Sequence, residues 1–97
     1  MSLPRRDSLP LHRPPTSPGA MLLEEHLKPA GMTQTTLAEQ MGVTVQTVNA
    51  IINGRRAITA EMAIKLSKAL NTAPQFWMNL QTNYDLWHAE RKLAKHG

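Results

Sequence analysis

From about residue 19 onward, the hydrophobic residues of this chain recur three and four positions apart, which is the spacing of one face of an α-helix. No run alternates apolar and polar residues as a half-buried strand would. The predicted fold class is therefore all-α. We expect five helices, from about Gly19 to Lys28, from Thr33 to near Gly42, from Thr44 to Asn53-Gly54, from Thr59 through Leu70, and from Thr72 to about Leu93.

Polar residues mark where the predicted helices begin. Three helices follow a threonine whose side-chain oxygen can accept a hydrogen bond from the first free N–H groups: Thr33, Thr44 and Thr59. The last helix begins with Thr72 and, three residues later, Gln75, a pair typical of a capping box. In the first helix, we expect three residues to face inward: Met21, Leu22 and Leu27.

The second and third predicted helices have the spacing of a DNA-binding helix-turn-helix. Two helices that cross at roughly 90–120° need a small side chain where their axes approach, and a corner residue that tolerates positive φ. Ala38 meets the first need and Gly42 the second. Val48 and Ile51 would fill the wedge between the helices. The opposite face of the third helix is then free to enter a groove of DNA.

The first turns of the third helix are the part that reaches base edges when such a helix enters the major groove. The predicted base contacts are therefore Val45, Gln46, Thr47, Asn49 and Ala50. Gln46 can pair with adenine through two hydrogen bonds, and Val45 and the Thr47 methyl can touch thymine methyl groups. Val45 and Ala50 are apolar and cannot form side-chain hydrogen bonds with bases. We therefore expect DNA shape to contribute to specificity.

Polar residues around this helix are the predicted phosphate contacts: Gln34, Thr44, Asn53, Arg55 and Arg56. The two adjacent arginines follow a glycine turn, and guanidinium geometry suits two parallel hydrogen bonds to a phosphate. A solvated polar surface is the alternative interpretation of both sets of residues.

Four segments resemble the HigA/VapI-type antitoxins, a branch of the XRE (Cro/phage repressor-like) helix-turn-helix family. These segments are RPPTSPG (13–19), LKPAGMTQTTLAEQMGV (27–43), INGRRAIT (52–59) and APQFWMNLQTNYDL (73–86). The resemblance implies that positions matching Val45, Gln46 and Ala50 read bases, and that the position matching Gln34 binds phosphate. It also implies a homodimer that binds its own inverted-repeat operator and pairs with a HigB-like toxin.

The prolines divide the chain. Five of the seven lie in residues 1–19, together with three of the arginines. We therefore expect a flexible Pro/Arg-rich arm over residues 1–17 and the helix-turn-helix domain over residues 18–97. The net charge is +4, but residues 20–71 hold five bases and four acids. Phosphate affinity is thus expected to depend on a few placed groups and on helix N-termini.

The remaining composition argues against other classes of protein. Cysteine is absent, the four histidines do not stand at metal-ligand spacing, and no nucleophile–base set is apparent. We expect no enzyme activity, no metal and no cofactor. No apolar run approaches the ~20 residues of a membrane span, so we expect no membrane partner and a cytoplasmic location, on the nucleoid when bound to the operator. Glu24 and Glu25 are expected to be a solvated pair, or else to attract a basic toxin surface.

Large residues gather in the last predicted helix. Trp77, Leu80 and Tyr84 lie on one helical face, with Trp87 one turn further. Two interpretations stay open for them, the core of the domain or a dimer interface, where aromatic residues are enriched. The interface is the prediction for all four residues.

These predictions favour a sequence-specific DNA-binding transcriptional repressor that acts as the antitoxin of a type II HigB/HigA-like toxin–antitoxin system and autoregulates its operon. The alternative is a stand-alone XRE-family transcriptional regulator without a toxin partner. A helical adaptor that binds only protein is a third class, and Gln46, Arg55 and Arg56 argue against it.

Overall fold

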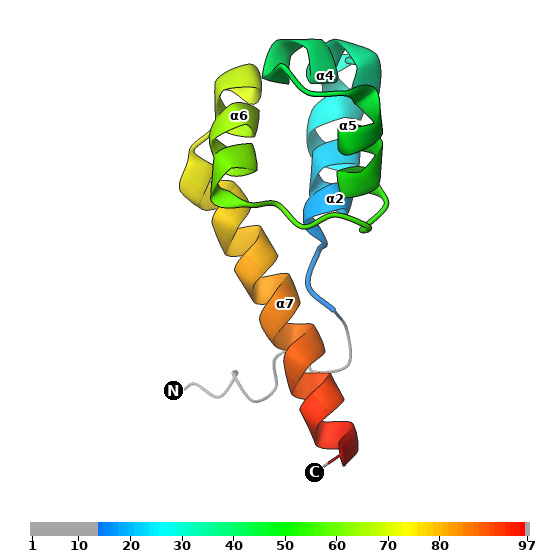
Figure 1. The fold of residues 1–97 in the computed structure, drawn as a ribbon, viewed down its shortest axis with the longest axis vertical. Coiled ribbons are helices and arrows are strands. Elements are labelled where there is room, and N and C mark those ends of the chain that lie inside the picture. Colours follow the sequence, from blue (N-terminus) through cyan, green and yellow to red (C-terminus); the bar gives the residue numbers. More distant parts are fainter. Residues whose placement is uncertain (1–13, 97) are drawn as a thin grey trace.

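The computed structural model describes residues 14–96, and every regular element in that part of the chain is a helix (Figure 1). The first helical segment continues from α2 (Pro18–Ala20) through the π-helical η1 (Met21–Leu27) into α3 (Lys28–Ala30). It is followed by α4 (Gln34–Met41), α5 (Val45–Ile52), α6 (Ala60–Leu70) and α7 (Pro74–His96). The all-α prediction with five helices is confirmed. Most of the predicted arm, residues 1–13, lies outside the described residues.

The predicted threonine caps are present. In each case the hydroxyl accepts a hydrogen bond from the backbone N–H three residues later, at 3.0 Å for Thr33, 3.2 Å for Thr44 and 3.2 Å for Thr59. Ser17 does the same for the first helical segment, at 3.1 Å. These four caps fix the starting points of α2, α4, α5 and α6.

The start of α7 differs from the predicted capping box. The Thr72 hydroxyl accepts a hydrogen bond from the indole N–H of Trp77 at 2.8 Å, and the Gln75 side-chain amide donates to Asn79 at 2.9 Å. The physical reason is the burial of Trp77, because a buried indole N–H requires an acceptor. Thr72 supplies that acceptor.

The first helical segment has an unexpected register. The N–H of Lys28 donates to the carbonyl of Leu23, five residues earlier, and Pro29 has no N–H to donate. Leu22 and Leu27, themselves five residues apart, are both buried. The wider turn therefore places the predicted inward residues on the core side, although not with α-helical geometry. Met21 is half-buried against the same core.

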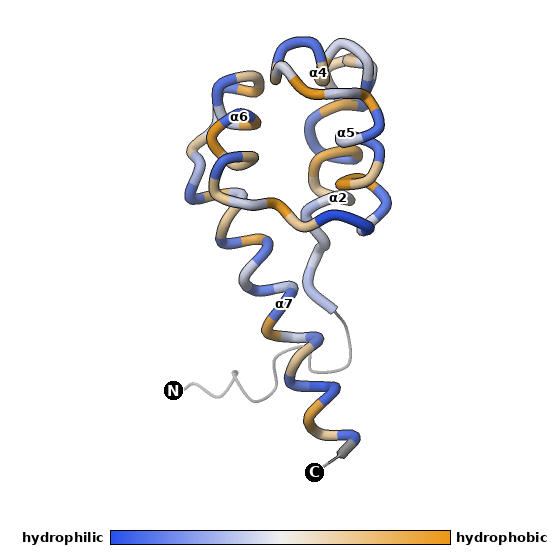
Figure 2. Tube along the Cα trace, viewed as in Figure 1, coloured by the Kyte–Doolittle hydropathy of each residue, from blue (hydrophilic) through white to orange (hydrophobic). Residues whose placement is uncertain are grey.

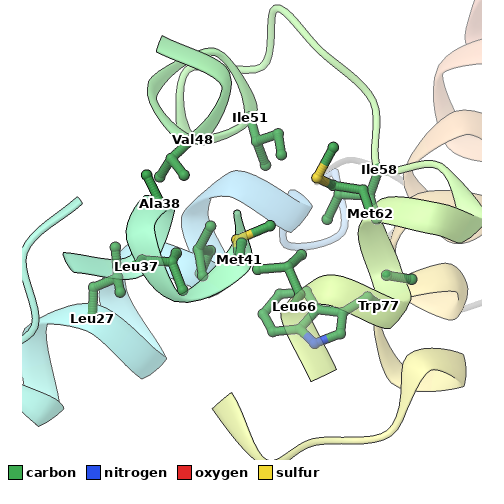
Figure 3. Close-up of a cluster of buried hydrophobic side chains, with 12 residues drawn as sticks. Leu27, Leu37, Ala38, Met41, Val48, Ile51, Ile58, Met62, Leu66 and Trp77 are labelled. Atoms are coloured by element: carbon green, nitrogen blue, oxygen red, sulfur yellow. The ribbon is translucent and has the colours of Figure 1, made fainter. Parts of the chain in front are cut away.

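All the helices except α3 surround one hydrophobic core, part of which Figure 3 shows. Trp77 of α7 is fully buried and lies beside Leu66 of α6. The buried apolar residues of the described chain are Leu22, Leu27, Leu37, Ala38, Met41, Val48, Ile51, Ile58, Met62, Ala63, Leu66 and Trp77. This core holds α4 and α5 in a fixed relation to α7.

The helices pack mainly in two pairs, α4 with α5 and α6 with α7, and α2 contacts both α5 and α7. The C-terminal half of α7 extends away from the other helices (Figure 1). Along this extension hydrophobic and hydrophilic residues alternate (Figure 2), and Leu86 and Leu93 are 56% and 71% exposed. Among the described helices, none combines the length and the apolar character needed to cross a membrane.

Candidate nucleic-acid interface

The turn between α4 and α5 has the conformation that the sequence predicts. Gly42 ends α4 with φ 73° and ψ 33°, in the left-handed region that glycine adopts without steric strain. Ala38, Val48 and Ile51 are at most 3% exposed, so they form the wedge between the two helices. This packing leaves the first turns of α5 at the surface.

The exposed face of α5 begins with Val45 and Gln46. Both side chains are exposed, whereas Thr47 and Ala50 are half-buried. The hydroxyl groups of Thr44 and Thr47 are hydrogen bonded to each other at 3.1 Å. The Thr47 hydroxyl thus has one of its hydrogen-bonding positions used within the protein, and its methyl group stays available for a contact with a base.

A hollow of about 280 Å³ brings five of the predicted DNA-contacting residues together, from α4, from α5 and from the loop after α5. Its lining consists of Gln34, Val45, Gln46, Asn49 and Arg55. Since these residues were predicted separately as base and phosphate contacts, their common location supports a single binding surface.

The side chain of Asn49 is engaged inside this hollow. Its amide nitrogen donates to Gln34 Oε1 at 3.3 Å. Its amide oxygen accepts from Asn53 Nδ2 at 3.0 Å and from an Arg55 terminal guanidinium nitrogen at 3.1 Å. Asn49 was predicted to contact a base, but it is turned toward three of the predicted phosphate contacts.

The loop after α5 carries both arginines. The backbone N–H groups of Arg55 and Arg56 donate to the carbonyl of Ala50 at 2.8 and 3.2 Å. Gly54, which precedes the two arginines, has φ 77°. The loop is therefore ordered by the C-terminal end of α5 itself. Both arginine side chains are exposed, and Arg55 reaches back over the hollow toward Asn49.

Two residues that the sequence analysis missed hold this loop and α5 in place. Gln81 of α7 is 8% exposed; its side-chain oxygen accepts from the N–H of Ile58 at 2.8 Å, and its nitrogen donates to Asp85 at 2.9 Å. Gly19 lies so close to α5 that an added Cβ would be 2.4 Å from the carbonyl oxygens of Ile51 and Ile52. The sequence holds a weak signal for each. Gln81 is a polar residue on the Trp77 face of its helix, and Gly19 is a glycine at a predicted helix start.

The predicted dimer residues of α7 have different environments. Trp77 is 0% exposed, so its side chain offers no surface to a second copy, and its place in the interface is corrected to the core. Leu80, Tyr84 and Trp87 are half-buried. The Arg91 guanidinium lies 4.6 Å from the centre of the Trp87 ring. Half-exposed large side chains thus remain on α7 from Leu80 onward.

The two acidic residues of the first helical segment, Glu24 and Glu25, both lie at the surface. Glu24 forms an exposed ion pair with Lys28 at 3.1 Å, one helical turn away, and Glu25 is exposed. Within residues 14–96, no cluster of three or more His, Cys, Asp or Glu side chains is arranged to hold a metal ion.

Comparison with known proteins identifies the family. Residues 23–77 match a helix-turn-helix family. Antitoxin HigA-1 of Vibrio cholerae is 48% identical over 80 residues, which cover 82% of this chain and 75% of that protein. An uncharacterized HTH-type transcriptional regulator of Haemophilus influenzae is 46% identical over 78 residues, which cover 80% of this chain and 73% of that protein.

Solved structures agree with the sequence relatives. The Pseudomonas aeruginosa antitoxin HigA, solved with the higBA promoter, superposes with a TM-score of 0.80 at 39% identity over 84% of this chain and 89% of that chain. Antitoxin GraA in complex with its operator gives 0.79 at 42% identity over 87% and 85%. These relatives are regulators and antitoxins, in agreement with the prediction of a protein that is not an enzyme. The chain belongs to the XRE-type helix-turn-helix family that includes the HigA antitoxins.

Proposed function

We propose that this protein is a sequence-specific DNA-binding repressor that represses its own operon. The observation that carries the proposal is the hollow in which Gln34, Gln46 and Arg55 meet on the exposed side of α5. The relatives solved with a promoter or an operator support it, because they share this fold at about two-fifths identity.

The proposed contacts follow from the placement of each side chain. We assign base contacts to the exposed face of α5, at Val45, Gln46, Thr47 and Ala50. Phosphate contacts are assigned to the polar groups around that face, at Gln34, Thr44, Asn53, Arg55 and Arg56. Since phosphate contacts position the protein and base contacts specify the sequence, the two sets should respond differently to mutation.

The proposed active form is a homodimer on an inverted repeat. One helix-turn-helix reads few base pairs, and two-fold symmetry doubles the site, with recognition helices about 34–36 Å apart. We assign the interface to Leu80, Tyr84 and Trp87 of α7, where half-buried large side chains continue into the exposed Leu86.

The proposed partner is a HigB-like toxin, which would make this chain the antitoxin of a type II system in the bacterial cytoplasm. The relative named antitoxin HigA-1 favours this role. The relative named an uncharacterized HTH-type transcriptional regulator is compatible with the alternative, a stand-alone regulator without a toxin. Coexpression with the adjacent open reading frame separates them. A toxic neighbour that this chain neutralises and binds supports the antitoxin role, and a neighbour without toxicity supports the stand-alone role.

The repressor role is tested by footprinting the purified chain on the region upstream of its own gene. We expect protection of an inverted repeat. Arg56→Ala should weaken binding to all duplexes alike. It should also make the negative slope of log K against log salt shallower by about 0.9, the value for one lost phosphate contact. Protection of no discrete site would contradict the proposal.

The dimer is tested by sedimentation of Trp87→Ala, with the exposed Glu90→Ala on the same helix as the control. We expect Trp87→Ala to shift the chain toward monomer and to reduce operator affinity, while Glu90→Ala stays dimeric. A Trp87→Ala chain that remains a tight dimer would place the interface elsewhere.

A further inference from the structure

Asn49 is the centre of a polar network that joins α4, α5 and the arginine loop. An asparagine side chain offers two N–H donors and an oxygen with two lone pairs. Here the oxygen accepts from both Asn53 and Arg55, at 3.0 and 3.1 Å, and one N–H donates to Gln34 at 3.3 Å. Three of its four hydrogen-bonding positions are thus already used within the protein.

This network fixes which atom of the Gln34 amide faces Asn49. Because Gln34 Oε1 accepts from Asn49, the Gln34 amide nitrogen is directed away from Asn49. An amide nitrogen is the group that can donate to a phosphate oxygen, whereas an outward oxygen would repel it. Asn49 therefore sets the orientation of Gln34 that suits an anion.

The same network holds the guanidinium of Arg55. One terminal nitrogen donates to Asn49, and a guanidinium carries five N–H donors in a rigid plane, so the others remain free. A flexible arginine that is ordered before binding loses less entropy when it meets its phosphate. Asn53 donates to the same oxygen from one turn further along α5.

We propose that Asn49 is a positioning residue, which orders Gln34, Asn53 and Arg55 as a phosphate clamp and does not itself read a base. The inference rests on the proposed DNA-binding function and deepens it. Asn49 acts on affinity through its neighbours, so its contribution is the same on every DNA sequence.

The test uses the full chain and compares Asn49→Ala, Arg55→Ala and the double variant on two duplexes, the footprinted operator and a scrambled sequence of the same length. Alanine has the higher helix propensity, so Asn49→Ala should stay folded, which thermal melting checks. Asn83→Ala, an exposed asparagine of α7, is the matched control. Binding is followed by fluorescence anisotropy at several salt concentrations.

We expect Asn49→Ala to raise Kd by about 3- to 10-fold on both duplexes, the effect of ordering one long side chain. Arg55→Ala should make the negative slope of log K against log salt shallower by about 0.9, while Asn49→Ala leaves the slope unchanged because the arginine still reaches its phosphate. In the Arg55→Ala background, adding Asn49→Ala should raise Kd by a smaller factor than it does in the wild-type background. Asn83→Ala should match the wild type.

Two results would overturn the inference while leaving the proposed function intact. One is an Asn49→Ala chain that loses affinity only for the operator, with a factor in Kd that multiplies with the factor from Arg55→Ala. That is the behaviour of an independent base contact. The other is an Asn49→Ala chain that binds both duplexes as tightly as the wild type. A wild-type chain that does not prefer its operator would instead overturn the proposed function, and the inference with it.

Discussion

The close approach of α2 to the recognition helix makes Gly19→Ala a decisive substitution. The added Cβ would lie 2.4 Å from the carbonyl oxygens of Ile51 and Ile52 and 2.8 Å from the carbonyl carbon of Ile52. All three are backbone atoms at the end of α5, so no side chain can rotate to make room. Either α2 or the end of α5 must move.

Two opposing effects decide the sign of the change in stability. Alanine favours a helix over glycine by about 1 kcal/mol, which would stabilise the variant. Overpacking a filled site typically costs about 1–3 kcal/mol, and more where nothing can yield. With backbone on both sides the overpacking cost should lie at the upper end of its range, about 2–3 kcal/mol, so we expect a net loss of about 1–2 kcal/mol. For a domain of this size that lowers Tm by roughly 4–8 °C per kcal/mol.

Urea denaturation of the full chain measures this loss, and operator binding measures its effect on α5. Gly31→Ala is the control, because nothing lies within 4 Å of its added Cβ and its φ is 64°. Its backbone strain costs about 1–2 kcal/mol on its own, but operator affinity should be unchanged. A Gly19→Ala chain as stable as the wild type, with unchanged affinity, would refute the close packing of Gly19 against the end of α5.

Two further substitutions test the contacts of α7 with the rest of the domain. Gln81→Leu keeps the side-chain volume but leaves the N–H of Ile58 without its acceptor, so we expect urea denaturation to show a free energy of unfolding lower by about 1–3 kcal/mol. The control is Gln75→Leu, exposed on the same helix, which should change the free energy of unfolding by less than about 0.5 kcal/mol. Trp77→Ala should cost about 3–5 kcal/mol by opening a cavity in the core, and Leu93→Ala, 71% exposed, should cost far less. A small loss for Gln81→Leu would mean that water replaces the amide, and a small loss for Trp77→Ala would mean that the core collapses around the gap.

The sequence was sufficient where the determining interactions are local. A threonine cap acts within three residues, and the left-handed turn at Gly42 depends on that residue alone, so both were predictable. Periodicity also gave the inward positions of Leu22 and Leu27. It did not give the π-helical register, since seven residues are too few to separate a 3.6-residue repeat from a wider one.

What the sequence did not reveal depends on pairs that are distant along the chain. Gln81 and Ile58 are separated by 23 residues, and Asn49 and Gln34 by 15. The position of Gln81 on the Trp77 face was the one local sign that its side chain is engaged, and no local feature names Ile58 or Gln34 as a partner. Trp77 was placed with the interface residues for the same reason, because helical spacing puts it on a face with Leu80 and Tyr84 but does not say how deeply it is buried.

Gln46→Ala tests most directly whether the exposed face of α5 reads a DNA sequence. Gln46 is exposed at the start of α5 and lines the hollow with Arg55. Kd should be measured for the wild type and the variant on the operator and on scrambled DNA at one salt concentration. We expect the variant to lose about 1–3 kcal/mol on the operator and much less on scrambled DNA, as for a bidentate contact with a base. Equal losses on the two duplexes would show that Gln46 does not read a base.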